Sequence, residues 1–359
     1  MADLARLARR ARGGRALALA RSMVGALGVV ACAADPGYGG RSTKQWIAQL
    51  ADPTTSARLE ATTALGRVLA VYPQSAPAVA ALVGALADTS DDVRVSAARE
   101  LATEGVRAPD AVPGLARAMA DSEHAWVREQ VAGVLGTVLD QSLPPDARAA
   151  TGWPTREDRP RVDAAVLAVG VDALIRGLGD PHGEVRTEAA TALRRLGPRA
   201  ARVAPQVIPA WRDLAGAAQP GLRVLAFDGL TAGGAPAALV LPLADAAIRR
   251  DTAAVVRTAA IHAVAPLGAA ATAAVPTLRI ALRDPDAGVR LAAAVALGKI
   301  GPGAAVSDLR AALTDADARV RVEAAHTLDA FHRRGGQDAP PAEPTPLQKC
   351  AGRLGTPGC

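Results

Sequence analysis

The stretch Leu278–Pro302, LRIALRDPDAGVRLAAAVALGKIGP, decides the fold. Its second part carries one apolar stripe, because apolar residues recur every three or four positions, as in a helix with one buried face: Val289, Ala292, Ala293, Ala296, Leu297 and Ile300. Asp284 and Pro285 separate this part from an earlier apolar helix, since Asp caps a coming helix and Pro fits its first turn. Gly301 and Pro302 then end it. The stretch therefore predicts two short helices joined by a turn.

This hairpin recurs along most of the chain. One arginine of the second helix marks each copy: Arg58, Arg94, Arg128, Arg186, Arg223, Arg257, Arg290 and Arg321. Consecutive markers stand 31 to 37 residues apart, except for one gap of 58 residues. A hairpin of this size cannot cover its own apolar face, so neighbouring copies have to stack. The sequence predicts an all-α fold, an α-α superhelix built as a right-handed solenoid of about eight hairpins.

The composition favours closely packed helices. Hydrophobic residues make up 50% of the chain but aromatic residues only 2%, so the core has to consist of Ala, Leu and Val. Small side chains let helices approach one another closely. Alternation of polar and apolar residues is nowhere sustained, which predicts essentially no sheet. Trp46, at the start of the array, is expected to cap the first hairpin, because that hairpin has a neighbour on one side only.

The repeated pattern Asp-Pro-x-x-x-Val-Arg-x-x-Ala-Ala-x-x-Leu resembles HEAT repeats, in particular the short HEAT-like repeats that also occur in phycobilisome lyases. The sequence matches it well at 180–197 and 284–301, fairly at 88–105, 251–268 and 315–328, and weakly at 121–139 and 213–234. The resemblance implies a structural ladder in which the turn aspartate of one repeat meets the helix arginine of an adjacent repeat. The candidate ladder residues are Asp52, Arg58, Asp88, Arg94, Asp180, Arg186, Asp251, Arg257, Asp284, Arg290, Asp315 and Arg321.

The charge of the chain is concentrated at its beginning. The net charge is +6, but residues 1–31 hold six arginines and one acidic residue, which leaves 35 basic and 34 acidic residues in the remainder. A phosphate backbone is bound through a strong basic surface. The balanced remainder therefore argues against nucleic acid as a partner.

The first 31 residues are predicted to be a signal peptide or leader. The run from Ser22 to Ala31 is uncharged and mostly apolar, too short to span a bilayer but suited to a secretory signal. The residues Val29, Val30, Ala31 and Cys32 resemble the lipobox of bacterial lipoproteins, which implies a lipid on Cys32 and a place in the cell envelope, on the periplasmic side. The alternative is a cytoplasmic protein in which Cys32 is an ordinary buried cysteine.

The remaining chain divides into four predicted parts: a flexible tether at 32–41, a solenoid at 42–334, an inserted loop within it at 140–162, and a disordered Pro- and Gly-rich tail at 335–359. Trp153 in the inserted loop is a candidate partner-binding residue, because a large aromatic side chain can anchor an interface. The alternative is that Trp153 folds back onto the array. Cys350 and Cys359 could pair if the protein is exported.

We find no catalytic pattern in the sequence. The five histidines do not form a His-Glu-x-x-His motif, and both the phosphate-binding loop pattern and the Gly-x-Ser-x-Gly pattern are missing. No metal site, cofactor or small-molecule substrate is predicted. The sequence favours a non-enzymatic scaffold that binds an unknown protein partner along the concave face of the solenoid, tethered to a membrane through Cys32. The alternative is a cytosolic lyase-like or enzyme-accessory HEAT-repeat protein.

Overall fold

The structure is a computed structural model of the chain and describes residues 37–73, 75–102, 111–121, 123–142, 163–301 and 305–334. The predictions for Cys32, Trp153, the leader at 1–31 and the tail at 335–359 lie outside these residues. The chain divides into two compact units, 1–108 and 109–359. We describe each unit by itself.

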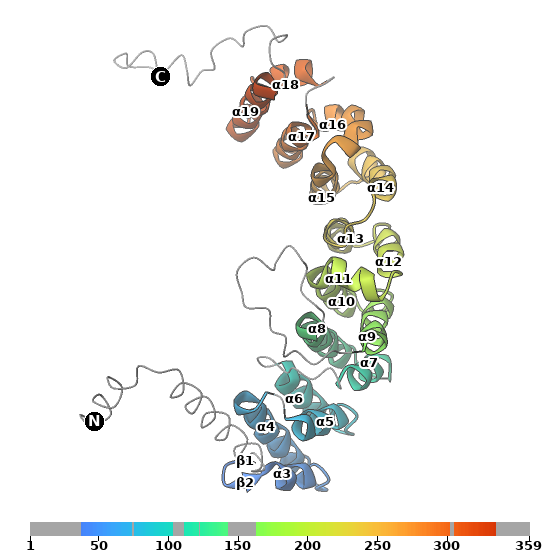
Figure 1. Ribbon diagram of the computed structural model, residues 1–359, viewed down its shortest axis with the longest axis vertical. Helices are drawn as coiled ribbons and strands as arrows, with labels where there is room; N and C mark the ends of the chain where they lie inside the picture. The colour runs from blue at the N-terminus through green and yellow to red at the C-terminus, as the bar shows by residue number, and fades with distance from the viewer. Residues whose placement is uncertain are drawn as a thin grey trace, which may run out of the picture. The chain divides into compact units, whose positions relative to one another are not determined.

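The described residues of unit 1 form two helical hairpins and a short ribbon (Figure 1). Its elements are β1 (Gly37–Tyr38), β2 (Arg41–Ser42), α3 (Thr43–Gln49), α4 (Thr55–Val71), α5 (Ala76–Ala85) and α6 (Asp91–Ala102). Ser42 caps α3, because its side chain accepts a hydrogen bond from the Gln45 amide while the Gln45 side chain accepts one from the Ser42 amide.

The ribbon differs from the flexible tether that we predicted for 32–41. Gly37 pairs with Ser42 and Tyr38 with Arg41 in an antiparallel register. The indole of Trp46 donates a hydrogen bond to the Tyr38 carbonyl oxygen at 2.9 Å, and the Arg41 guanidinium lies 4.8 Å from the centre of the Trp46 ring. Trp46 is thereby 5% exposed. Strands of two residues are too short to show an alternation of polar and apolar residues in the sequence. The contact with Trp46 stabilises this ribbon instead.

Six helical hairpins and two short connecting helices make up the part of unit 2 that the structure describes (Figure 1). Its elements are α7 (Val112–Asp121), α8 (Ala125–Ser142), α9 (Ala164–Gly177), α10 (Gly183–Leu196), α11 (Pro198–Val203), α12 (Val207–Leu214), α13 (Pro220–Ala232), α14 (Ala237–Arg250), α15 (Ala254–Val264), η2 (Ala265–Ala274), α16 (Val275–Ala281), α17 (Ala287–Ile300), α18 (Val306–Ala312) and α19 (Ala318–Arg334).

The helices of unit 2 form two rows. The first helices of the hairpins stand in one row, and the second helices pack successively against one another in the other, in the order α8, α10, α13, α15, α17 and α19. We call this the second-helix row. With the two hairpins of unit 1, the described residues contain eight hairpins, each with one marker arginine on its second helix. The predicted all-α superhelix is confirmed.

The predicted apolar stripe forms the core. In α17, Val289 is fully buried, Leu297 is 2% exposed and Ile300 is 9% exposed. Glycine allows the second helices to approach closely: a Cβ atom on Gly136 of α8 would lie 2.5 Å from the Ala192 side chain of α10. Small residues at these contacts explain how a chain with few aromatic residues fills its core.

The inserted loop begins later than predicted. Helix α8 continues through Ser142, so the first three residues of the predicted loop, 140–142, are helical. Asp163 begins the array again, because its side chain accepts a hydrogen bond from the Ala165 amide at 2.9 Å and caps α9. Helices α8 and α10 pack against each other across the insertion, so it does not interrupt the second-helix row.

One segment of the described chain, Ala254–Ala281, is long and apolar enough to cross a membrane by length and composition. It consists of α15, η2 and α16, and Gly268 has a positive φ of 54° within it. The segment packs against α14 and α17. The segment is apolar because its short Ala-rich helices contribute to the core of the array.

Candidate functional site

The ladder residues of neighbouring repeats meet in pairs. Arg257 donates hydrogen bonds from Nε and Nη2 to the two carboxylate oxygens of Asp284, both at 2.7 Å. Its Nη1 donates to the carbonyl oxygen of Asp251 at 2.9 Å. The arginine is thus fixed by its own turn and joined to the next repeat by a two-pronged ion pair, a geometry that suits the planar guanidinium.

Five such inter-repeat pairs occur among the described residues: Arg58–Asp88, Arg128–Asp180, Arg223–Asp251, Arg257–Asp284 and Arg290–Asp315. The members of these pairs are largely buried, with side chains 9–15% exposed. Arg128 and Arg223 were absent from the candidate ladder set, because no aspartate precedes them by six residues. Both arginines are marker arginines of the repeat, and this position alone would have predicted their place in the ladder.

Three other candidate ladder residues make contacts within their own repeats. Arg94 forms an ion pair with Asp91 and donates to the Asp88 carbonyl oxygen at 2.6 Å. Asp52 accepts hydrogen bonds from the amide and hydroxyl of Thr54 at 2.8 and 2.6 Å. Arg321, on the last second helix, donates through Nη1 to the carbonyl oxygens of Asp315 and Ala316 at 2.7 and 3.0 Å.

Arg186 has a neutral partner in the next repeat. Its Nη1 binds the carbonyl oxygens of Asp180 and Pro181, as in the other repeats, but its Nη2 donates to Gln219 Oε1 at 3.2 Å. The residue six positions before Arg223 is Ala217, where the aspartate of the pattern would stand. The sequence matches the repeat pattern weakly in this region, and the structure shows the consequence: one inter-repeat ion pair is replaced by a weaker hydrogen bond.

The ion pairs keep their carboxylates charged. The hydrogen bond and charge of Arg290 hold the pKa of Asp315 below its ordinary value. For Asp251, burial pushes the pKa up, but hydrogen bonds from Arg223 and the Ala253 amide outweigh it, so the net shift is downward. These aspartates are therefore ionised at neutral pH and engaged in holding repeats together.

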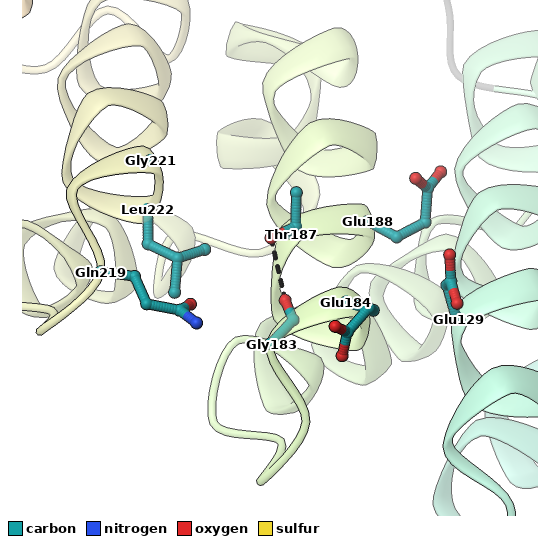
Figure 2. Close-up of a pocket in the computed structure, with 8 residues that line it drawn as sticks. All are labelled: Glu129, Gly183, Glu184, Thr187, Glu188, Gln219, Gly221 and Leu222. Carbon is teal, nitrogen blue, oxygen red and sulfur yellow. Dashed lines mark hydrogen bonds between the residues drawn. The ribbon is translucent and has the colours of Figure 1, made fainter. Parts of the chain in front are cut away.

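A pocket of about 410 Å³ includes Gln219 in its lining (Figure 2), and Gln219 is the residue that accepts a hydrogen bond from Arg186. It opens on the second-helix row and is lined by residues of three successive second helices and the turn before α13: Glu129, Gly183, Glu184, Thr187, Glu188, Gln219, Gly221 and Leu222. Glycines make room for neighbouring side chains at two places. A Cβ atom would lie 2.9 Å from Glu188 Oε1 if added to Gly133, and 2.9 Å from Gln219 Nε2 if added to Gly183.

The pocket is acidic. Figure 2 shows Glu129 of α8 and Glu184 and Glu188 of α10 on the same side of it. Burial of the Glu188 carboxyl raises its pKa, opposed by the charge of Arg195 and aided by that of Glu129. Three carboxylates on one side can accept hydrogen bonds from an ammonium or guanidinium group. The lining residues include no nucleophile paired with a base, which nucleophilic catalysis would need.

The described residues contain no group of three or more His, Cys, Asp or Glu side chains that could hold a metal ion. His182 is exposed at the turn before α10, with Nδ1 3.2 Å from Arg128 Nη2. It belongs to the inter-repeat contact of Arg128 and Asp180 and lies outside the lining of the acidic pocket.

The fold and its ladder belong to a known class. A family model of HEAT repeats matches residues 43–136, 240–329 and 274–349, which together make up more than half of the chain. The chain is therefore a member of the HEAT-repeat family. A search of curated proteins finds no match.

Two solved structures with TM-scores above 0.5 share the fold at low sequence identity. The chain is similar to YibA of Escherichia coli, with 16% identity, a TM-score of 0.51, and coverage of 80% of this chain and 92% of that one. It is also similar to Kap95p in a complex with RanGDP, with 14% identity and a TM-score of 0.54, and here it spans only 41% of the other chain. The CpcE–CpcF complex of phycocyanin lyase from Nostoc shares 18% identity, with coverage of 82% and 97% and a TM-score of 0.37.

Proposed function

We propose that this chain is a non-enzymatic scaffold that binds a protein partner on its second-helix row, with the acidic pocket at α8, α10 and α13 as the contact for a basic side chain of that partner. The observation that carries the proposal is the pocket itself. It combines an opening on the second-helix row with three glutamates from two helices. Kap95p, whose structure is similar to that of this chain, is known in a complex with another protein, RanGDP.

Charge complementarity defines the expected partner. Glu129, Glu184 and Glu188 present negative charge at the pocket, and the raised pKa of Glu188 means that a nearby cation would stabilise its charged form. Electrostatic complementarity of this kind contributes to specificity and to the association rate. The partner should therefore present a lysine or an arginine on a protruding segment.

Site-directed photo-cross-linking in cells tests this proposal. A photoreactive residue at Thr187, which is exposed and lines the pocket, should capture a specific protein. The matched control carries the same residue at Ile280, which is 49% exposed on α16 in the first-helix row. Capture from Thr187 but not from Ile280 is the expected result, and the double substitution Glu184→Lys, Glu188→Lys should reduce the yield. Equal capture at both positions, or a yield unaffected by the charge reversal, would contradict the proposal.

We also propose that the scaffold is exported and held at a membrane by a lipid on Cys32. The support is the apolar run before Cys32 and the small residues next to it. Metabolic labelling with a fatty acid should mark the protein, and Cys32→Ala should abolish the label and release the protein from the membrane fraction. A protein that remains unlabelled, or a label that survives Cys32→Ala, would remove this part of the proposal without affecting the partner-binding part.

A further inference from the structure

Two positions of each second helix in unit 2 form the outward side of the second-helix row. Counted from the marker arginine, they are the residue two places before it and the residue one place after it. They are three residues apart and so lie on the same side of the helix. In α10 they are Glu184 and Thr187, and in α8 and α13 Glu129 and Gly221 occupy one of them. All four residues line the acidic pocket, which shows that these positions face outward.

In the four second helices after α10, the same two positions carry large aliphatic side chains. Each of these helices has one, and together we call them the apolar strip: Val224 of α13, Val255 of α15, Leu291 of α17 and Val322 of α19. Val255 is 62% exposed and Val322 59%, and the other two are partly exposed. A single exposed aliphatic residue is ordinary on a protein surface, but a row of them at equivalent positions marks a contact surface.

The apolar strip continues directly from the acidic pocket. The second helices from α10 to α19 pack against one another in chain order (Figure 1). Gly221 and Leu222 of α13 line the pocket, and Val224 follows Gly221 by one helical turn. The outward side of the row therefore changes from acidic to apolar within one helix. A partner bound at the pocket lies next to the strip.

The remaining residues at these two positions do not make the strip acidic. In α13, α15, α17 and α19 they are Gly221, Thr258, Gly288 and Arg319. Arg319, which is charged, pairs with Asp317 at 2.8 Å. The glutamates of the pocket thus have no counterpart at these positions along the strip. A partner that fits both surfaces has a basic residue at one end and apolar residues along the remainder.

The spacing of the helices favours one backbone conformation for that partner. Packed helices stand about 8–10 Å apart, so successive side chains of the strip are separated by about that distance. In a polyproline II segment every third residue faces the same side, after an advance of about 9.3 Å. A strand repeats after about 6.6 Å, and a helix after seven residues and about 10.5 Å. The polyproline II segment matches the row best.

We infer that the partner of the acidic pocket binds unit 2 as an extended polyproline II segment, with one lysine or arginine in the pocket and aliphatic side chains at every third residue on the apolar strip. The inference rests on the proposed function, because the pocket sets the register of the segment. Polyproline II is already populated before binding, so the segment loses little conformational entropy when it binds.

Mapped photo-cross-linking in cells tests this inference. Photoreactive residues are placed singly at Thr187, Val255 and Val322, which are exposed, so the substitutions leave the core intact. All three should capture the same protein through one segment of it. Peptide mass spectrometry should place the residue linked at Val322 about six residues from the residue linked at Val255, because two hairpins separate them and each corresponds to three residues.

The other results of this experiment overturn the inference. They are a separation of about 14 residues, which a helix would give, capture of different proteins or segments, capture of this chain itself, and no capture from Val255 and Val322. Capture from Thr187 without capture from the strip would remove the extended segment and leave the proposed function standing. If Thr187 captures no specific protein, the proposed function fails as well.

Affinity for the captured segment, made as a synthetic peptide, gives a second measurement. The double substitution Val255→Ser, Val322→Ser should weaken binding by about tenfold, because two apolar contacts are lost. The matched control is Val169→Ser, which changes a valine that is 45% exposed on α9 in the first-helix row and should leave the affinity unchanged. Equal affinities of the double variant and the control would overturn the contact with the strip.

Discussion

Two parts of the second-helix row differ in how successive repeats are joined. Between α15 and α19, Arg257 and Arg290 each hold an aspartate of the next repeat through two hydrogen bonds. Between α10 and α13, Arg186 reaches only Gln219, at 3.2 Å. The second helices nevertheless pack in both parts. Apolar contact therefore stacks the repeats, and the ion pair strengthens a contact that exists without it.

Two other features occur where α10 and α13 are joined by the weaker contact. The acidic pocket opens there, with Gln219 in its lining. The core of the same repeat contains a large aromatic side chain, which is rare in this chain. Trp211 of α12 is 1% exposed and lies against Gly229 of α13. The aspartate of the pattern is missing on the α13 side of the pocket, where Gln219 stands in its lining, whereas the ladder pair Arg128–Asp180 remains on the α8 side.

The largest expected effect tests whether both parts share one core. Leu297 of α17 and Leu193 of α10 stand seven residues after their marker arginines and are 2% and 1% exposed. Leu297→Ala and Leu193→Ala should each lower the free energy of unfolding by about 2–5 kcal/mol, because each leaves a cavity. Chemical denaturation measures both. A small loss at Leu193 alone would mean that the repeats around the pocket are held differently.

The next effect concerns the packing of Trp211. A Cβ atom on Gly229 would lie 2.3 Å from the indole ring, so Gly229→Ala should cost about 1–3 kcal/mol of unfolding free energy through overpacking. The matched control is Gly221→Ala in the same helix, where no other atom lies within 4 Å of an added Cβ. That variant should be neutral or slightly more stable, since alanine favours a helix. Thermal melts of equal midpoint for the two variants would contradict this packing.

Removing and adding one carboxylate compares the two kinds of inter-repeat contact directly. Asp284→Ala should lower the unfolding free energy by roughly 1–2 kcal/mol, between the values for exposed and buried ion pairs, because Asp284 and Arg257 are 10% and 12% exposed. Ala217→Asp should raise it by up to about 1 kcal/mol by giving Arg186 the missing partner. If Ala217→Asp destabilises the protein, the two turns do not share one geometry.

The smallest effect is the pH dependence of one pair. Asp315 has a folded-state pKa below its ordinary value of about 3.9. Its contribution to stability is therefore present above about pH 4 and is lost as the pH falls through the lowered pKa. Asp315→Asn should reduce the slope of unfolding free energy against pH in this acid range only. An unchanged slope would show that the Arg290–Asp315 pair does not favour the charged carboxylate.

The candidate site could be predicted only in part from the sequence. Glu184 and Glu188 are visible as two acids on one helix, but their proximity to Glu129 of α8 joins residues on either side of the insertion. The pocket also depends on Gly133 and Gly183, which make room for side chains of neighbouring helices. No local pattern records these contacts, because they arise where three separate helices meet.

The sequence by itself determined the repeat register, the apolar stripe and the residue types of the ladder, because helix periodicity and the Asp-Pro and Gly-Pro boundaries are local properties. The tertiary structure alone decided which arginine meets which aspartate, including Arg128 with Asp180 across the insertion, and which pair is missing at Arg186. It also decided the ribbon on Trp46. These features depend on which surfaces of the folded chain come into contact. Contacts between residues far apart in the sequence produce no periodic pattern from which they could be predicted.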